Sequence, residues 1–246
     1  MSLFGDMALV GFGGGPSSNP IQYVGGKVVA QTGSVGSVDI AIDSGLTGGV
    51  ASAAAAGDFV LIMHGQANGS TITFTDGTTA YTYVAATAQI DDTPAAKALY
   101  YRAGWKFMGG TPDTFIRLPA SGNAQHTRLS AVAVFRNVNT TTPIDVAQVS
   151  ATSAATLNAD PGSISSAATA CVVAFGAAIS DAAIGSNYSS SDLTDFQTAG
   201  FGSAINGVAG FGHKLLAGTF NAAQFTGPGA GTNPANVALS IALRAA

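Results

Sequence analysis

The stretch that decides the fold is Arg128–Val146, with the sequence RLSAVAVFRNVNTTTPIDV. Leu129–Phe135 consists almost entirely of small or β-branched apolar residues, which is typical of a buried strand. Asparagines and threonines then interrupt the apolar run, and Pro143 favours an extended or turn conformation in the residue before it. A second apolar run follows at 144–149. The stretch therefore predicts a buried strand, a tight polar corner and a departing strand, which together are the unit of a β-sandwich.

The amino-acid composition favours strands and turns over helices. Only 9% of the 246 residues are charged, against roughly 25% in an ordinary globular domain. All 13 acidic residues are aspartate, which favours turns, whereas glutamate, a good helix former, is absent. No window shows a sustained apolar pattern of 3.6-residue spacing with helix caps. The composition therefore predicts an all-β protein, long enough for one large domain or two small ones.

Further strands are predicted from short apolar or alternating runs that are bounded by turn-forming residues. These strands are Lys27–Gln31, Val38–Ile42, Asp58–Gly65, Ser70–Thr75, Thr78–Val84, Ala98–Met108, Thr114–Leu118, Ala170–Ile179, Gly207–Leu216, Phe220–Phe225 and Asn236–Ala246. Asp76-Gly77 lies between two of these runs and predicts a β-hairpin. The low-complexity segment Gly45–Gly57 and the polar segment around Tyr188 are predicted to be loops.

The order of the predicted strands repeats about halfway along the chain. DFVLIMHG at 58–65 corresponds to ACVVAFGAAI at 170–179, and ALYYRAGWKFM at 98–108 corresponds to GVAGFGHKLLAG at 207–218. TFIRLPA and RLSAVAVFRNV correspond likewise to FNAAQFTG and NVALSIALRAA. Two halves that cannot each bury an apolar face alone would pack face to face. We therefore expect an antiparallel, jelly-roll-like β-sandwich of two pseudo-repeated halves, with two consecutive small domains as the alternative.

Residues 1–24 are predicted to form a flexible, Gly/Pro-rich N-terminal arm in front of a sandwich domain at 25–246. Glycines at 11–15 and the segment PSSNP at 16–20 give a flexible and then kinked linker. An exposed apolar segment on a tether usually has a binding partner. The apolar residues of the arm are Leu3, Phe4, Met7, Leu9, Val10 and Phe12. They either dock on a partner subunit or pack along their own domain, and the sequence favours neither.

The net charge and the length of the apolar runs argue against nucleic acid and membranes as partners. The net charge is -4 and the basic residues are scattered, so the chain offers no phosphate-binding patch for nucleic acid. No apolar stretch is long enough to insert into a membrane as a helix. The N-terminal sequence lacks the positive charge and the length of a secretory signal. The single cysteine, Cys171, lies in an apolar run and is predicted to be an inert buried thiol.

The sequence offers no catalytic constellation, metal site or cofactor-binding motif. The three histidines, His64, His126 and His213, are not spaced as metal ligands. The carboxylate pairs Asp91–Asp92 and Asp192/Asp195 lie in Ser-, Thr- and Pro-bearing sequence that favours turn capping over glycosidase chemistry. No calcium-loop pattern occurs, although calcium held by aspartate loops stays conceivable. We expect no enzyme activity.

Aromatic residues suggest one binding site. Alternation along the predicted strand 98–108 places Tyr101, Trp105 and Phe107 on one face and Tyr100 on the other. Exposed aromatic rings could stack on a sugar, and Tyr101 and Trp105 are the candidate residues for such a glycan site. In a sandwich, such residues are more often part of the core.

Low charge favours an assembled protein. A free monomer usually needs charge to stay dispersed, whereas a surface of Ser, Thr, Asn, Ala and Gly suits burial between subunits. We therefore expect a homo-oligomer or a subunit of a larger assembly.

The string SAVAVFRNVNTTTPIDV resembles a motif of phage and prophage virion proteins. In these proteins an apolar strand ends in a Tyr/Phe-Arg corner and an Asp/Asn-Thr-Thr-Pro-Ile/Leu-Asp turn follows. GDFVLIMHG, AGW and the closing SIALRAA are similar too, so the resemblance covers about residues 22–246. Phe135 and Asn137 stand where tyrosine and glycine are usual in this motif.

The resemblance implies a β-sandwich with a structural role and no catalysis. The expected function is a component of a bacteriophage virion: a head spike, fibre or decoration protein, or a tail component. It would be assembled in the host cytoplasm with other capsid or tail subunits. A carbohydrate-binding or host-adhesion module that binds a host surface glycan is the alternative, and an aspartate-based glycan-cleaving enzyme is the least favoured.

Overall fold

The computed structural model describes residues 19–32, 36–67, 72–84, 89–92, 97–118, 120, 127–152, 156–202, 206–227, 229 and 234–246. Within these ranges the regular elements are all β-strands and every strand pair is antiparallel. The same residues form no helix long and apolar enough to cross a bilayer. The predicted all-β, antiparallel fold class is therefore confirmed.

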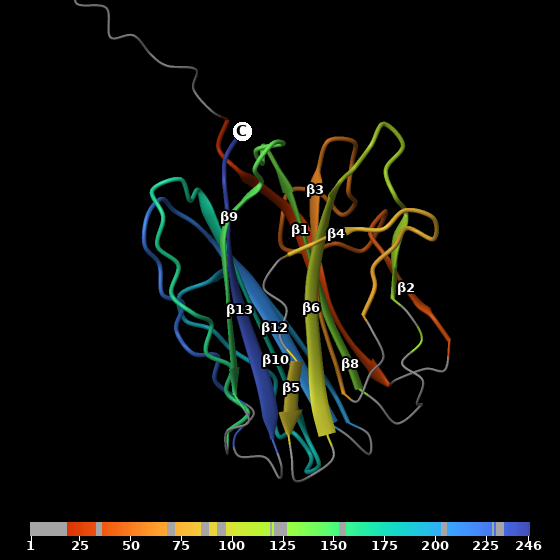
Figure 1. Ribbon diagram of the computed structural model, residues 1–246, viewed down its shortest axis with the longest axis vertical. Helices are drawn as coiled ribbons and strands as arrows, with labels where there is room; N and C mark the ends of the chain where they lie inside the picture. The colour runs from red at the N-terminus through yellow and green to blue at the C-terminus, as the bar shows by residue number, and fades with distance from the viewer. Residues whose placement is uncertain are drawn as a thin grey trace, which may run out of the picture.

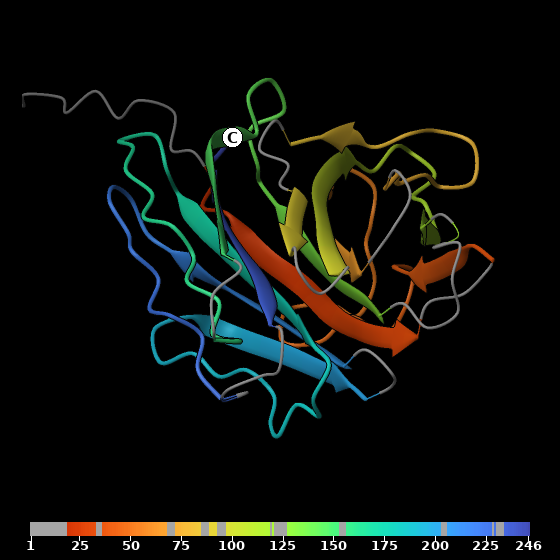
Figure 2. The ribbon, with the colours of Figure 1, turned by 60° about the horizontal axis from the view of Figure 1, so that its bottom comes forward.

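Two large sheets, one from each half of the chain, form the body of the molecule (Figures 1 and 2). Sheet 1 has the order β1 (Gln22–Thr32), β8 (Thr127–Arg136), β3 (Phe59–Ala67), β6 (Lys97–Phe107) and β4 (Thr82–Tyr83), and β5 (Gln89–Asp92) also pairs with β6. Sheet 2 has the order β11 (Thr194–Phe201), β12 (Asn206–Leu215), β10 (Cys171–Ser180), β13 (Ala235–Leu243) and β9 (Ile144–Thr152). A separate pair, β2 (Val38–Ala41) and β7 (Phe115–Leu118), lies over the outer face of sheet 1.

The two halves repeat the same strand pairing. The order β1-β8-β3-β6-β4 in sheet 1 is matched by β9-β13-β10-β12-β11 in sheet 2. The pair β2–β7 is matched by a single bridge between Ile164 and Phe220, which lie in the corresponding segments of the second half. Even the irregularities agree, because β1 bulges at Val24 and β9 bulges at Asp145, opposite equivalent positions of β8 and β13. The repeat that the sequence predicts is thus present in the hydrogen-bond ladder.

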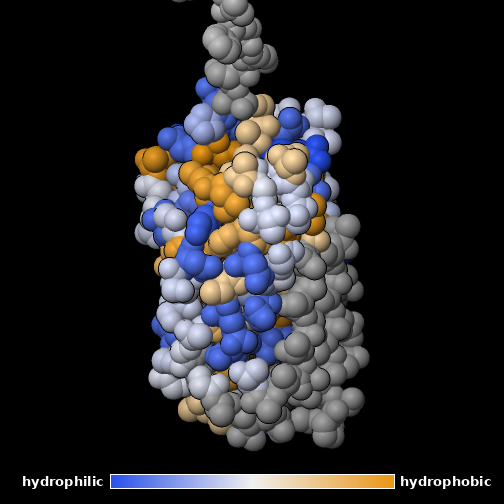
Figure 3. Space-filling model, turned by 90° about the vertical axis from the view of Figure 1, so that its left-hand side faces the viewer, coloured by the Kyte–Doolittle hydropathy of each residue, from blue (hydrophilic) through white to orange (hydrophobic). Residues whose placement is uncertain are grey.

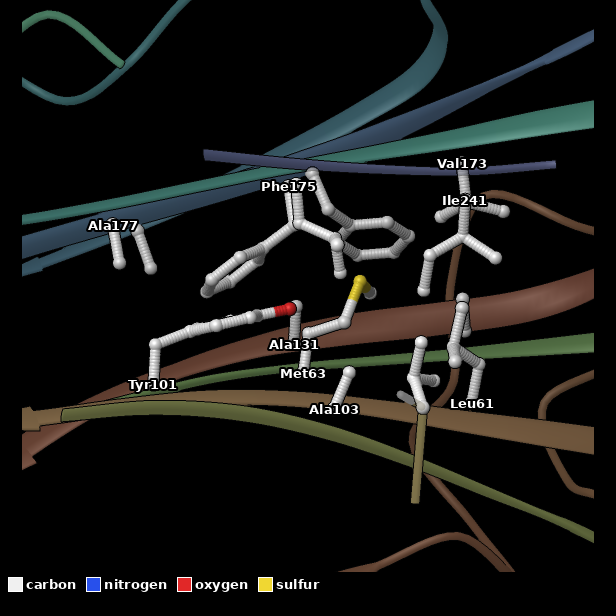
Figure 4. Close-up of a cluster of buried hydrophobic side chains, with 14 of the residues drawn as sticks. Leu61, Met63, Tyr101, Ala103, Ala131, Val173, Phe175, Ala177 and Ile241 are labelled. Atoms are coloured by element: carbon white, nitrogen blue, oxygen red, sulfur yellow. The ribbon is translucent and has the colours of Figure 1, made fainter. Parts of the chain in front are cut away.

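The central core lies between the two sheets (Figure 4). Leu61, Met63 and Tyr101 from sheet 1 interdigitate with Val173 and Phe175 and their neighbours from sheet 2. Alanines fill the positions where the sheets come closest; Ala103, Ala131 and Ala177 are examples in the close-up. Because one continuous core joins the halves, the chain forms one sandwich and not two separate small domains.

The outer faces of both sheets are also buried. Val60, Ile62 and Val132 face away from the central core and pack under β2, β7 and the loops of the first half. Loops of the second half cover sheet 2 with side chains such as Leu157 and Phe225. A strand buried on both faces needs apolar residues at every position. This explains why DFVLIMHG and ACVVAFGAAI read as continuous apolar runs.

The corner after β8 carries the chain from sheet 1 to sheet 2. The Asn139 side-chain oxygen accepts hydrogen bonds from the backbone N–H groups of Thr141 and Thr142, at 3.0 and 2.9 Å, which closes the turn. Arg136 at the end of β8 pairs with Asp58 at 2.8 Å, and Arg244 after β13 pairs with Asp145. The segment RNVNTTTPID at 136–145 is therefore a structural corner, as predicted.

Several predicted elements differ from those of the structure. β11 and β5 were not expected, and β5 places Asp91 and Asp92 in a strand and not in a turn. The predicted strand Phe220–Phe225 makes only an isolated bridge at Phe220, because it crosses the outside of sheet 2 without a continuous partner. In the predicted strand Ser70–Thr75, residues 70 and 71 lie outside the described residues and only Thr75 makes bridges. The first strand begins at Gln22, before the domain boundary predicted at residue 25.

The predicted hairpin at Asp76-Gly77 is reduced to a turn. Thr75 and Ala80 form a single antiparallel bridge across it, and the Asp76 carboxylate accepts hydrogen bonds from the backbone N–H groups of Thr78 and Thr79, at 2.7 and 2.6 Å. The jelly-roll arrangement of the strands stays a prediction.

Candidate functional site

A groove of about 620 Å³ opens where the edge strands β1 and β11 of the two sheets meet. We call it the arm-foot groove, because residues 20–23, through which the N-terminal arm joins β1, form one wall. Residues 48–50, Thr194, Asp195 and His213 form the rest of it, together with Asn137 and Leu215.

Asn137 fixes the foot of the arm. Its side-chain N–H donates a 2.9 Å hydrogen bond to the carbonyl oxygen of Pro20, and its own carbonyl accepts one from the backbone N–H of Ala246. Pro20, near the start of the described chain, and Ala246, its last residue, are therefore both held by Asn137. Figure 1 shows these two ends close together in its upper part. Asn137 has a φ of 60°, in the left-handed region that glycine adopts most easily.

The opposite wall is a loop held against β1. Val50 and Ala51 donate backbone hydrogen bonds to the carbonyl oxygens of Tyr23 and Val24, at 3.3 and 2.9 Å. Gln197 of β11 donates to the carbonyl oxygen of Thr47 at 2.9 Å and to the Tyr23 hydroxyl at 3.3 Å. The groove is therefore built from backbone whose position is fixed on both sides.

Apolar side chains are exposed at this groove. Val50 is 59% exposed and Leu215 is 51% exposed, and these are the large hydrophobic residues left exposed in the described part of the chain. Both line the arm-foot groove. Figure 3, a view of one side of the molecule, shows hydrophobic surface gathered on its upper part.

A histidine and a carboxylate face each other in the groove. The His213 ring packs on the Tyr23 ring with centroids 4.3 Å apart, and its Nε2 lies 3.9 Å from the Asp195 carboxylate. Burial lowers the pKa of His213, and the Asp195 charge opposes this shift. Burial and then the Asp195 charge raise the pKa of Tyr23. Both rings are therefore neutral near pH 7.

A second groove, of about 390 Å³, lies at the other edge of the sandwich, and we call it the Trp105 groove. Residues 82–84, Trp105, Ile144, Asp145 and Ala147 line it. Strand pairing makes it the counterpart of the arm-foot groove, because Trp105 pairs with Thr82 and Leu61 as His213 pairs with Thr194 and Val173. The two halves thus carry equivalent grooves with different side chains, an indole in one and an imidazole in the other.

The structure separates the two residues of the predicted glycan site. Tyr101 is 1% exposed and stacks on Phe175 in the central core, so its ring has no free face for a sugar. Trp105 is half-buried at its groove. Its ring centroid lies 5.6 Å from that of Phe59 and 5.9 Å from that of Phe107. The predicted alternation is confirmed, since Tyr101, Trp105 and Phe107 share the central core and Tyr100 packs on the outer one.

Other candidate residues have structural surroundings. Asp192 accepts hydrogen bonds from Ser190 and from the backbone N–H of Ala223, which agrees with the predicted capping role. His64 is fully buried, and Cys171 is buried with its thiol pKa raised by burial. Among the described residues no cluster of His, Cys and Asp could hold a metal ion. The arm residues Leu3, Phe4, Met7, Leu9, Val10 and Phe12, and also His126, lie outside the described residues.

Sequence reasoning missed the residues of the arm-foot groove. Val50 stands in a segment that reads as a low-complexity loop, and Leu215 closes an apolar strand, so neither stands out by its neighbours. Asn137, in the corner after β8, is one residue of the groove that the sequence does single out.

The chain was compared with models of protein families, with curated proteins and with solved structures, and none of them matches it.

Proposed function

We propose that this protein is a structural component of a bacteriophage virion, a head spike, fibre, decoration or tail subunit that assembles through its N-terminal arm and does no catalysis. The observation that carries the proposal is the arm-foot groove, where exposed Val50 and Leu215 adjoin the point at which the arm leaves the sandwich. Exposed apolar surface at a fixed groove favours a protein–protein contact. The corner motif and the low charge are consistent with this role.

Particle purification tests the proposal. Phage particles are released by lysis of infected cells that express the chain and are separated on a density gradient. The chain is then quantified in each fraction by mass spectrometry. We expect it to band with the capsid and tail proteins in a fixed ratio to them. Recovery only among the free proteins of the lysate would contradict a virion role.

A second candidate function is host adhesion by binding a surface glycan at the Trp105 groove. The observation that favours it is the half-buried indole, which two further rings support and which a sugar could cover. Trp105 is the only tryptophan, so intrinsic fluorescence reports this groove alone. A glycan that binds there should change the emission of Trp105, and the change should weaken in Tyr83→Ala. If no glycan of a broad panel alters the emission, the adhesion function is contradicted.

A further inference from the structure

The arm-foot groove combines three features that distinguish it within the described surface. Both exposed large hydrophobic residues, Val50 and Leu215, line it. So do the two non-glycine residues with positive φ, Asn137 at 60° and Asp195 at 48°. Backbone conformations of this kind persist where the surrounding structure enforces them, and they gather at binding sites. The third feature is His213, which is 3% exposed and whose Nδ1 has no hydrogen-bond partner among the described residues.

We propose that the arm-foot groove binds the apolar segment Leu3–Phe12 of a second copy of this chain. The inference rests on the proposed assembly through the arm and specifies its receptor. Six of the ten residues of this segment are large and apolar, which matches a groove that exposes Val50 and Leu215.

The position of the arm favours a second copy over the chain's own segment. The foot of the arm is fixed at the rim of the groove by the Asn137 hydrogen bond to Pro20. In the sequence, Gly15 and Asn19 each precede a proline, which favours extended backbone at these two positions. A return of the chain's own apolar segment to the groove would need a reversal at the glycines at 13–15, where ordering costs the most backbone entropy. A neighbouring copy can supply the segment without a reversal.

A matched pair of variants tests the groove. Thr194 lines the arm-foot groove and Thr82 lies at the equivalent position of the Trp105 groove, and both side chains are exposed. Thr194→Arg fills the first groove, and Thr82→Arg fills its counterpart. By sedimentation velocity over a wide range of concentration, the full chain should self-associate. Thr194→Arg should raise the dissociation constant by roughly tenfold or more, whereas Thr82→Arg should leave it unchanged.

Mixing distinguishes a second copy from the chain's own arm. One variant carries Thr194→Arg with an intact arm, and the other carries Phe4→Ser, Leu9→Ser and Phe12→Ser with an intact groove. Each should be monomeric alone, and together they should form a one-to-one complex, because the arm of the first fits the groove of the second. Circular dichroism and the melting temperature of each variant verify that it is folded.

Three results would overturn the inference. They are a wild-type chain that stays monomeric at every concentration, self-association that Thr194→Arg does not weaken, and mixed variants that do not combine. None of these results bears on whether the chain occurs in phage particles, so the virion proposal and this inference can fail separately.

Discussion

Asn137 shows how a single backbone conformation can shape the arm-foot groove. With a φ of 60°, it turns the chain out of β8 and directs its amide to the Pro20 carbonyl. This conformation costs a residue with a Cβ atom about 1 kcal/mol, and it costs asparagine less than most because its short polar side chain forms local hydrogen bonds.

Asn137→Ala should therefore lower the free energy of unfolding by about 1–2 kcal/mol, from backbone strain and the lost hydrogen bond. Asn137→Gly relieves the strain and should lower it by less. Urea unfolding followed by Trp105 fluorescence measures both variants. Equal stabilities of the alanine and glycine variants would show that the conformation of residue 137 is not strained.

His64 lies inside sheet 1 in a small polar group. Its Nδ1 is 2.7 Å from the Ser130 hydroxyl and its Nε2 is 3.2 Å from the Gln66 side-chain oxygen, and all three residues are buried. Burial lowers the pKa of His64 to about 4, the Gln66 hydrogen bond opposes the shift, and the positive charge of Arg128 adds to it. The folded protein therefore keeps this ring neutral under conditions where an exposed histidine would be charged.

The free energy of unfolding should fall as the pH drops from about 6.5 to about 4, because the unfolded chain then binds a proton that folded His64 does not. The full loss is about 3 kcal/mol, at 1.36 kcal/mol for each pKa unit. Urea unfolding across this range, compared with His64→Gln, isolates the contribution, since the variant should show a flatter dependence. His213 contributes with the same sign, so the variant should keep some slope. Equal slopes in both proteins would contradict the assignment to His64.

At the scale of elements, β1 depends on a close approach to sheet 2. A Cβ atom on Gly26 would lie 2.5 Å from the Phe211 ring and 2.7 Å from the Tyr23 hydroxyl, and would also meet the Val132 carbonyl oxygen. No rearrangement of a flexible side-chain end relieves all three contacts. The glycine is thus what lets this edge strand pack between the loop at 45–51 and β12.

Gly26→Ala should lower the free energy of unfolding by about 1–3 kcal/mol, because the added methyl group overpacks the contact. Gly110→Ala is the matched control, since a Cβ atom there meets nothing within 4 Å, and it should change stability by less than about 0.5 kcal/mol. Thermal or urea unfolding measures both. If both variants changed the free energy of unfolding by a similarly small amount, β1 would be able to move away from sheet 2 without loss of stability.

The buried strands could be predicted from sequence because burial on both faces leaves an unmistakable apolar run, as in β3, β8 and β10. In β13 the alternation of large and small residues also indicated the faces correctly, with Leu239 and Ile241 in the central core. β11 was missed because an edge strand with sequence TDFQTAGF is partly exposed and needs no apolar pattern. The segment Phe220–Phe225 has apolar residues at both ends. These side chains pack on the outer face of sheet 2, but the segment does not form a continuous ladder of strand hydrogen bonds.

The candidate site was less predictable than the fold. A groove between β1 and β11 depends on the register between two sheets, and single-strand patterns carry no information about it. Trp105 and Tyr101 illustrate this limit, since both belong to one face of β6. Only the distance of each from the end of the sandwich decides that Trp105 reaches a groove and Tyr101 does not.

At the scale of the whole molecule, the halves share one core, so they should unfold together. Phe175 from the second half stacks on Tyr101 from the first with centroids 5.6 Å apart, and the core continues on either side of this contact. Separating the halves would expose the inner faces of both sheets to water. Each half alone would therefore lack much of its apolar burial.

Two unique residues allow this cooperativity to be measured. Trp105 is the only tryptophan and lies in the first half, and Cys171 is the only cysteine and lies in the second. Trp105 fluorescence and the reactivity of the Cys171 thiol should report the same midpoint in urea, because a two-state transition gives coincident probes. Exposure of Cys171 at a lower urea concentration than the change in Trp105 emission would indicate halves that unfold separately.

The hydrogen bonds between β1 and β8 also decide how the molecule responds to mechanical force. β1 is joined to the arm at its first residue and runs antiparallel to β8 from Gln22 to Thr32. A pull on the arm along the axis of β1 therefore acts in shear, and the ladder bonds share the tension instead of opening one after another. The foot of the arm is further tied through Asn137 to the backbone of Ala246, so part of the tension passes to the segment that follows β13. A chain attached through its arm would thus resist being pulled off by loading both sheets of the sandwich at once.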